Sequence, residues 1–107
     1  MNELSIIPTT AADQTQAQEL ATLLVEQRLA ACVQMLPIHS CYSWEGQVVN
    51  EEEILLLIKT RSDLYEEVEA FIKDHHSYEV PEIIQIPVQQ GFVPYLNWII
   101  TNTTGEG

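Results

Sequence analysis

The sequence has 107 residues, of which sixteen are acidic and four are basic, and its formal net charge is -12. A chain of this length with an apolar content of 46% is typical of one globular domain, and the long Pro, Gly or Ser tracts that indicate disorder are absent. The charge excludes general binding to nucleic-acid phosphates or anionic lipids, because the few basic residues are scattered. It favours cations and basic partners instead.

The apolar segments and the cysteines indicate a soluble protein of the cytoplasm. The longest apolar run, residues 54–58, is far shorter than the roughly 20 residues that a membrane-spanning helix requires. The residues after Met1 lack the basic and then apolar stretch of a secretory signal. Cys32 and Cys41 are too few for a disulfide framework, so we expect reduced, mostly buried thiols.

The first part of the chain predicts a strand followed by a helix. Residues 4–10 fit a short strand, in which Pro8 cannot donate a ladder hydrogen bond and should lie at an edge-facing or bulged position. Asp13 is a good helix N-cap. Apolar side chains then recur at three- and four-residue spacing, which predicts an amphipathic helix that ends near Leu29. They are Ala17, Leu20, Ala21 and Leu24.

The middle of the chain predicts an unusually long hairpin. Residues 31–44 alternate loosely around an interruption at Pro37, as in a strand with a bend. Residues 45–47 supply the turn, in which Gly46 is free to adopt a positive φ. The chain returns through the apolar run at 54–58, which should be buried on both faces.

Three further elements are predicted after the hairpin. Ser62-Asp63 opens a second helix, whose apolar side chains follow i, i+4, i+7 and i+8 spacing and which should stop around His75-His76. The others are a short apolar strand at residues 83–86 closed by Pro87 and a short helix at 94–100. The end of the chain, residues 101–107, is expected to be frayed.

The order strand, helix, strand, strand, helix, strand is the βαββαβ plan of a ferredoxin-like α+β fold, with a core at about residues 4–100. Both long helices should cover one face of an antiparallel sheet, and the other face needs a cover. The hairpin extends beyond the part of the sheet that two helices can cover. Because its apolar edge would be exposed in a monomer, we expect self-association. The residues expected at the interface between copies are Tyr42, Trp44, Val48 and Val49.

Short motifs along residues 6–100 occur in an order and spacing that together are highly specific. They are Leu29-Ala30-Ala31-Cys32-Val33, Pro37, Ser40, Tyr42, Trp44-Glu45-Gly46, Lys59-Thr60, His76, Tyr78-Glu79-Val80-Pro81-Glu82, Gly91, Tyr95-Leu96 and Trp98. In these motifs the chain resembles CutA, the divalent-cation-tolerance family. The resemblance implies a ferredoxin-like subunit in a tight homotrimer, similar in architecture to the PII signalling proteins, with a role in tolerance of copper and other divalent metals.

Three positions depart from the family pattern. Ser77 stands where the family usually has proline, and Gln34 stands where asparagine is usual. Thr9 stands where members discussed as copper binders have cysteine. This last departure removes one candidate ligand and weighs against a copper site of that kind.

His75 and His76 are the main candidate metal ligands, because imidazole suits copper, zinc and nickel. Glu79 and Glu82 are weaker candidates, whose charge would concentrate a divalent cation such as Cu(II). Adjacent helical residues point about 100° apart, so both rings reach one ion only if the helix end unwinds or a second subunit contributes. The alternative is that the histidines cap the C-terminus of the helix.

Cys41 and His39 form a weaker candidate for a soft copper site, because a thiolate and an imidazole lie two residues apart. Cys41 has the opposite parity to the aromatic residues of the hairpin, so it should face a helix or a neighbouring chain. Cys32 lies between apolar residues and is expected to be a small core residue rather than a ligand.

The aromatic residues Trp44, Tyr42 and Tyr78 fit an interface or a core, with the lining of a pocket as the alternative. Lys59 should lie near Glu79 in the inferred fold. There it would form either a structural ion pair or the polar end of a small-ligand cleft between subunits.

The sequence has no Ser-His-Asp or Cys-His arrangement at a recognisable elbow and no Gly-rich loop before a helix, so we predict that the protein is not an enzyme. The acidic run at 51–53 is typical of a solvated guard at a hairpin edge. We predict a homotrimer that binds copper or another divalent cation without an organic cofactor. The alternatives are a structural trimer without a ligand, or a PII-like sensor with a small ligand between subunits, around Trp44, Lys59, Tyr78 and Glu79.

Overall fold

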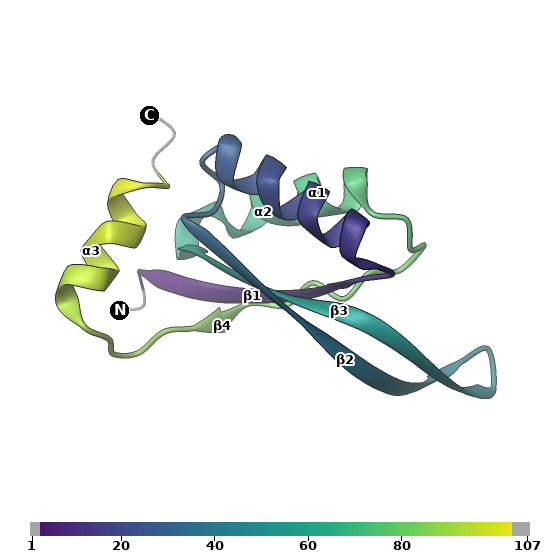
Figure 1. Ribbon diagram of the computed structural model, residues 1–107. Helices are drawn as coiled ribbons and strands as arrows, with labels where there is room; N and C mark the ends of the chain where they lie inside the picture. The colour runs from purple at the N-terminus through teal and green to yellow at the C-terminus, as the bar shows by residue number, and fades with distance from the viewer. Residues whose placement is uncertain (1–2, 104–107) are drawn as a thin grey trace.

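The computed structural model describes residues 3–103, which form a four-stranded antiparallel sheet with helices α1 and α2 on one face (Figure 1). The strands are β1 (Leu4–Ala11), β2 (Cys32–Trp44), β3 (Gln47–Arg61) and β4 (Ile86–Pro87). The helices are α1 (Gln14–Glu26), the 3-10 turn η1 (Ser62–Leu64), α2 (Tyr65–His75) and α3 (Val93–Thr101). The sheet order is β2-β3-β1-β4, and the predicted ferredoxin-like βαββαβ plan is confirmed.

The hydrophobic core lies between α1, α2 and one face of the sheet. Every second side chain of β1 and β3 points to this face, and Ile7 lies directly opposite Ile58 across the two strands. Leu24 of α1 and Ile72 of α2 pack over them, and all four side chains are fully buried. The apolar spacing of the two helices therefore indicated their buried faces correctly.

Helix α1 begins and ends at residues with distinct backbone roles. The Asp13 carboxylate accepts a hydrogen bond at 2.8 Å from the backbone amide three residues later, which confirms the predicted N-cap. The helix ends at Glu26, before the predicted end near Leu29, because Arg28 adopts a φ of 60°. The next two backbone amides then close the helix end by donating to Leu24 O.

The second helix does not begin at Ser62 and Asp63, contrary to our prediction. These residues form the 3-10 turn η1, and α2 follows it. The Ser62 hydroxyl is hydrogen-bonded to Ser5 Oγ at 2.7 Å, and Asp63 pairs with Arg61 at 2.6 Å, so neither side chain caps α2. The helix ends at His75, as predicted.

Strand β4 is shorter than predicted. Only Ile86 and Pro87 pair with β1, and residues 83–85 lie outside the strand. The carbonyl oxygen of Ile83 accepts a hydrogen bond from the Tyr65 hydroxyl at 3.3 Å. The backbone carbonyl of Ile83 is thus satisfied by a tyrosine hydroxyl instead of by a neighbouring strand.

Pro8 and Pro37 lie where no ladder donor is required. Val88 N donates to Leu4 O, so the even-numbered residues of β1 turn their backbone groups towards β4. The pairing of β4 reaches only to Ile86, and Pro8 lies beyond it. Pro37 belongs to β2, which is an edge strand. The edge-facing position that we predicted for Pro8 agrees with this arrangement.

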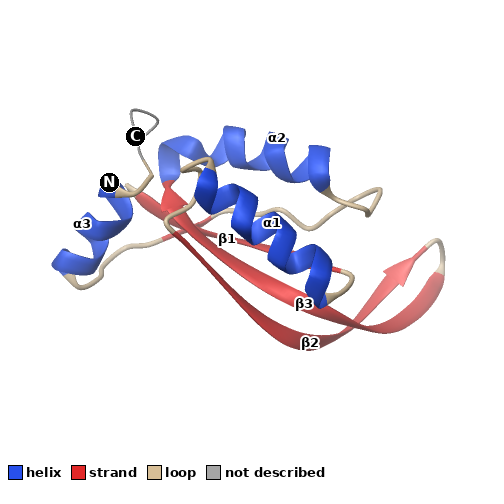
Figure 2. Ribbon diagram, turned by 45° about the horizontal axis from the view of Figure 1, so that its top comes forward, coloured by secondary structure: helices blue, strands red, loops and turns tan. Residues whose placement is uncertain are grey.

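β2 and β3 extend beyond the rest of the sheet as a two-stranded arm (Figure 2). β1 ends at Ala11, opposite Ile54, so the outer residues of β3 pair with β2 alone. We call residues 38–53 the arm. The long hairpin that the sequence predicted is therefore confirmed.

The arm ends in a turn of two residues, Glu45 and Gly46, which have φ angles of 51° and 80°. Positive φ at both positions gives the backbone twist that joins adjacent antiparallel strands. The turn sets Trp44 opposite Gln47. Gly46 is the residue that we expected at a positive φ, whereas Glu45 adopts the left-handed conformation despite its side chain.

The sheet face opposite α1 and α2, which we call the open face, has little cover (Figure 1). It carries Leu36, which is 43% exposed, and the half-buried Leu55 and Leu57. Helix α3 contacts β1 and β3 at one end of the sheet and exposes 45% of Trp98. The uncovered apolar surface expected from the sequence is present in the subunit.

The chain after α3 is ordered further than we expected. The helix includes Thr101, and Thr103 is fully buried with its hydroxyl donating to Ile99 O at 2.8 Å. Residues 101–103 therefore depart from the frayed end that we predicted, and 104–107 lie outside the described residues. No helix within residues 3–103 is long and apolar enough to cross a membrane.

Replacing Leu24 by alanine should lower the free energy of unfolding by about 2–5 kcal/mol, because this side chain is fully buried against the sheet. The neighbouring Val25 is 43% exposed, and its replacement by alanine should change that free energy by less than about 1 kcal/mol. Urea unfolding followed by circular dichroism measures both. Equal losses in the two variants would contradict the assignment of the core face.

Candidate functional site

A cleft of about 580 Å³ lies between the arm and the loop that follows α2, and we call it the arm cleft. This volume is in the range of small-molecule sites, about 300–1,000 Å³. Three aromatic side chains line it: Tyr42 and Trp44 from β2, and Tyr78 from the loop. Its other lining residues are Glu51, Glu53, Glu79, Glu82, Thr10, Ser40, Cys41 and Val80.

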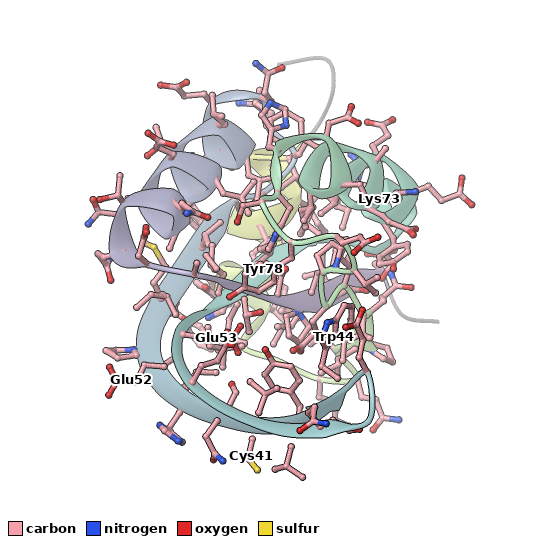
Figure 3. All side chains as sticks on the ribbon, turned by 90° about the vertical axis from the view of Figure 1, so that its right-hand side faces the viewer. Cys41, Trp44, Glu52, Glu53, Lys73 and Tyr78 are labelled. Carbon is pink, nitrogen blue, oxygen red and sulfur yellow. The ribbon has the colours of Figure 1, made fainter. Side chains whose placement is uncertain are left out.

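Two tyrosine-glutamate hydrogen bonds line the arm cleft, and one of them connects its walls. The Tyr42 hydroxyl donates to Glu51 Oε2 at 2.7 Å within the arm. The Tyr78 hydroxyl donates to Glu53 Oε2 at 2.8 Å and so ties the loop to the arm. Figure 3 shows Tyr78 and Glu53 turned towards each other, with Trp44 on the same inner side of the arm.

These contacts raise the pKa of both tyrosines. The hydrogen bond to Glu51 is the main cause for Tyr42, whose pKa rises to about 12. Burial is the main cause for Tyr78, and the hydrogen bond to Glu53 raises its pKa further. A folded-state pKa above the unfolded value of 10 means that the interaction contributes stability below pH 10. For Tyr42 that contribution is lost as the pH rises through about 12.

The strand register decides which residues of the arm face the cleft. Tyr42 and Glu51 belong to one set of alternating side chains. Cys41 and Glu52 belong to the other, and Figure 3 shows both side chains pointing away from the cleft that Cys41 borders. His39 lies opposite Glu52 and shares that outer side. The opposite parity of Cys41 and the aromatic residues is therefore confirmed.

Both ring nitrogens of His76 form hydrogen bonds within the subunit. Its Nδ1 accepts a hydrogen bond from Tyr78 N at 3.0 Å, so the proton of the neutral ring is on Nε2, within hydrogen-bond distance of Thr10 O. A neutral imidazole has one donor and one acceptor, and both are used here. His76 thus joins β1 to the loop that carries Tyr78, and it offers no free lone pair to a metal.

His75 differs from its neighbour because one ring nitrogen has no partner among residues 3–103. Its Nδ1 lies 2.9 Å from Phe71 O, and its ring stacks on that of Phe71 at 4.1 Å. With the proton on Nδ1, the Nε2 lone pair of this exposed side chain is available to solvent. The structure therefore separates two histidines that the sequence treats alike.

No group of three or more His, Cys, Asp or Glu side chains among residues 3–103 could hold a metal ion. Thr9 is fully buried and its Oγ1 has no hydrogen-bond partner, so this position belongs to the core rather than to a surface site. The described residues of one subunit therefore do not form a complete metal site. This applies to the pair of Cys41 and His39 as well as to the histidines at the end of α2.

Lys59 lies at the opposite end of β3 from the arm. Its Nζ is 3.3 Å from Tyr95 Oη and 5.3 Å from the centre of that ring. The ion pair with Glu79 that we considered does not form within residues 3–103, because Glu79 lines the arm cleft. One subunit therefore brings Trp44, Tyr78 and Glu79 together and leaves Lys59 apart from them.

Sequence reasoning missed Glu51 and Glu53, which we assigned to a solvated edge guard. Glu53 is only 7% exposed, Glu51 is half-buried, and among the three acids only Glu52 is exposed. Counting back from a two-residue turn would have placed both missed acids on the face of Tyr42, because strand side chains alternate. The thiols were also misjudged in part, since Cys41 is exposed and only Cys32 is half-buried.

The sequence is similar to proteins linked to divalent cations. The family model described as CutA1 divalent ion tolerance protein matches residues 5–102. The divalent-cation tolerance protein CutA of Thermus thermophilus is 40% identical over 104 residues, which are 96% of this chain and 99% of that protein. Human protein CutA is 46% identical over 84 residues, 78% of this chain and 47% of that protein. The chain thus spans about half the length of the human and mouse relatives.

Solved structures agree with the sequence comparison. The periplasmic divalent cation tolerance protein CutA from Archaeoglobus fulgidus has a TM-score of 0.93 at 37% identity, over 94% of this chain and 99% of that one. CutA1 from Shewanella sp. SIB1 has a TM-score of 0.91 at 40% identity, over 95% and 96% of the two chains. The similarity therefore covers almost the whole fold.

Replacing Glu51 by alanine should lower the pKa of Tyr42 from about 12 towards 10, because the hydrogen bond to the carboxylate is the main cause of the rise. Replacing Glu52 by alanine removes an equal charge from the other side of the arm and should leave the pKa unchanged. Tyrosinate absorbance during an alkaline titration reports both. Superimposable curves for the two variants would show that Glu51 does not control Tyr42.

Proposed function

Because the chain belongs to the CutA1 divalent ion tolerance family, we propose that it is a homotrimer that binds copper or another divalent cation in the response to metal ions. The free Nε2 of His75 is the observation that carries metal binding in this chain. An exposed imidazole suits Cu(II), and the net charge of -12 raises the local concentration of cations. The proposal involves no catalytic step.

A single imidazole is not a complete metal site. Residues 3–103 of one chain supply no converging group of three ligands, so the further ligands would come from another subunit. Glu79 and Glu82 remain candidates for that role, because both side chains are exposed and so can be reached by a neighbouring subunit. His76 is removed from the ligand set, since both of its nitrogens are hydrogen-bonded.

Self-association is supported by the open face and by the arm. Leu36 is 43% exposed and Val48, at the tip of the arm, is 76% exposed, so water contacts a large apolar area in an isolated subunit. β2 also presents a row of unpaired backbone groups along its outer edge. A trimer would cover these surfaces, with Tyr42, Trp44, Val48 and Val49 near the contact.

The cytoplasm is the proposed location. Free thiols at Cys32 and Cys41 suit a reducing compartment. The names of two relatives place those proteins elsewhere: the Archaeoglobus protein is called periplasmic and an Arabidopsis relative chloroplastic.

A small-ligand sensor of the PII kind is the second candidate function. The arm cleft favours it, because its volume and aromatic walls suit an organic molecule. In this form of the proposal the ligand contacts Trp44, Tyr78 and Glu79, while Lys59 contributes only if another subunit brings it to the cleft.

Titration calorimetry with Cu(II) should show saturable binding that His75→Ala weakens by about tenfold or more, since a ligand is lost. His76→Ala should retain copper binding and instead lose about 1–3 kcal/mol of folding stability, because two hydrogen bonds of its ring disappear. Equal copper binding by the wild-type protein and His75→Ala would refute His75 as the ligand.

Light scattering after size exclusion should give the mass of three subunits for the wild-type protein. Leu36→Glu should shift it towards the monomer, because a charge is placed on the open face. Val25→Glu is the matched control, since Val25 is also 43% exposed but lies on α1. A monomeric wild-type protein, or identical behaviour of the two variants, would contradict the proposed interface.

A further inference from the structure

Helix α3 has apolar side chains on more than one side, but the subunit covers only one of them. Ile99 lies on the covered side and is 4% exposed. The opposite side carries Tyr95 and Trp98, preceded by Val93 and by Phe92 just before the helix, and all four side chains are exposed. We call these four residues the α3 surface. A helix with apolar side chains all round is normally buried on all sides, so the α3 surface lacks its cover in one subunit.

The charge pattern around the α3 surface suits an acidic partner such as a second copy. Residues 83–105 are the longest stretch of the sequence without an acidic or basic side chain, although the whole chain has a net charge of -12. Lys59 lies beside this stretch, with its Nζ 3.3 Å from Tyr95 Oη. A second copy, which is itself strongly acidic, therefore meets no carboxylate on α3 and one ammonium group next to it.

The tip of the arm, residues 44–48, has properties that match the α3 surface. Val48 is 76% exposed, and Trp44 is 42% exposed. Glu45 adds an exposed carboxylate at the turn between the two strands. The tip therefore presents apolar side chains beside one negative charge, which complements Lys59 next to the α3 surface.

Other surfaces of a second copy fit the α3 surface less well. The outer side of α1 and α2 carries exposed carboxylates, among them Glu19, Glu26, Glu66 and Glu67, and burial of a carboxylate against apolar side chains costs free energy. Contact between two α3 surfaces is self-complementary and produces a two-fold dimer. A closed ring of three instead requires contacts between two different surfaces of the subunit.

We propose that the tip of the arm of one copy docks on the α3 surface of the next copy, with Val48 against Phe92 and Trp98, and with Glu45 near Lys59. The two surfaces lie at opposite ends of the subunit, whose longest extent is 44 Å (Figure 1). The contact therefore joins copies head to tail, and a ring of three uses every such surface. This inference rests on the proposed homotrimer and names the surfaces that the homotrimer joins.

Cysteine cross-linking on the full chain tests the docking. Val48→Cys and Val93→Cys are combined in a chain that also carries Cys32→Ala and Cys41→Ala, which remove the native thiols. A flexible bismaleimide reagent should then give covalent dimers and trimers on a denaturing gel. Each single cysteine variant in the same background should stay monomeric on the gel, because Val48 meets Val93 of another copy and neither residue meets itself.

The outcomes separate the docking from the assembly itself. A trimeric wild-type protein whose double cysteine variant gives no cross-linked species would overturn the docking and leave the proposed trimer intact. A monomeric wild-type protein would overturn both. Equally strong cross-linking of Val48→Cys alone would show that the arm tips meet one another, which also overturns the docking on α3.

A charge on the α3 surface provides a second test, which needs no cysteine background. Phe92 is 75% exposed, so Phe92→Glu should fold normally by circular dichroism but raise the dissociation constant of the trimer by about tenfold or more. Val25→Glu adds the same charge on α1 and should raise it by less than about threefold. Sedimentation equilibrium, in urea if the wild-type trimer does not dissociate on dilution, measures both constants. Equal constants for the two variants would overturn the proposal.

Discussion

The register between β2 and β3 is the constraint on which both the core and the arm cleft depend. The two-residue turn Glu45-Gly46 sets the first pair of the hairpin, and every later pair follows from it along the two strands. A slip by one residue would turn Ile58 away from the helices and, at the same time, turn Tyr42 away from Glu51. The apolar core therefore enforces the geometry of the polar cleft, although the two lie on opposite faces of the sheet.

The two faces of the sheet have different roles, because α1 and α2 cover only one of them. On the covered face, burial of side chains such as Ile7 stabilises the subunit. On the other face, Leu36 stays exposed and the arm extends beyond any helix, which leaves surface for a second copy and space for a ligand. His76 connects the two regions, because it bonds to β1 through Thr10 and positions Tyr78 over the arm.

Elements that depend on neighbouring residues could be predicted from the sequence. The cap at Asp13 and the turn at Gly46 follow from local backbone preferences, and the helix faces follow from periodicity. The predictions that failed depend on partners far along the chain. Ser62 has the chemistry of a helix cap but bonds to Ser5, and the Ile83 carbonyl bonds to Tyr65 instead of a strand. The conformational preferences of neighbouring residues do not predict such contacts between distant segments.

The sequence by itself determined the fold, the long hairpin, the acidic charge and the residue types available for binding, because these follow from patterning, turn chemistry and composition. Only the tertiary structure decided what each candidate can do. It uses both nitrogens of His76 and leaves one on His75, buries Glu53 beside Tyr78, and keeps Lys59 at the far end of β3. The reason is physical. An imidazole or a carboxylate can bind a ligand only through an atom that is not already hydrogen-bonded within the protein. The groups that form those hydrogen bonds often come from segments that only folding brings near.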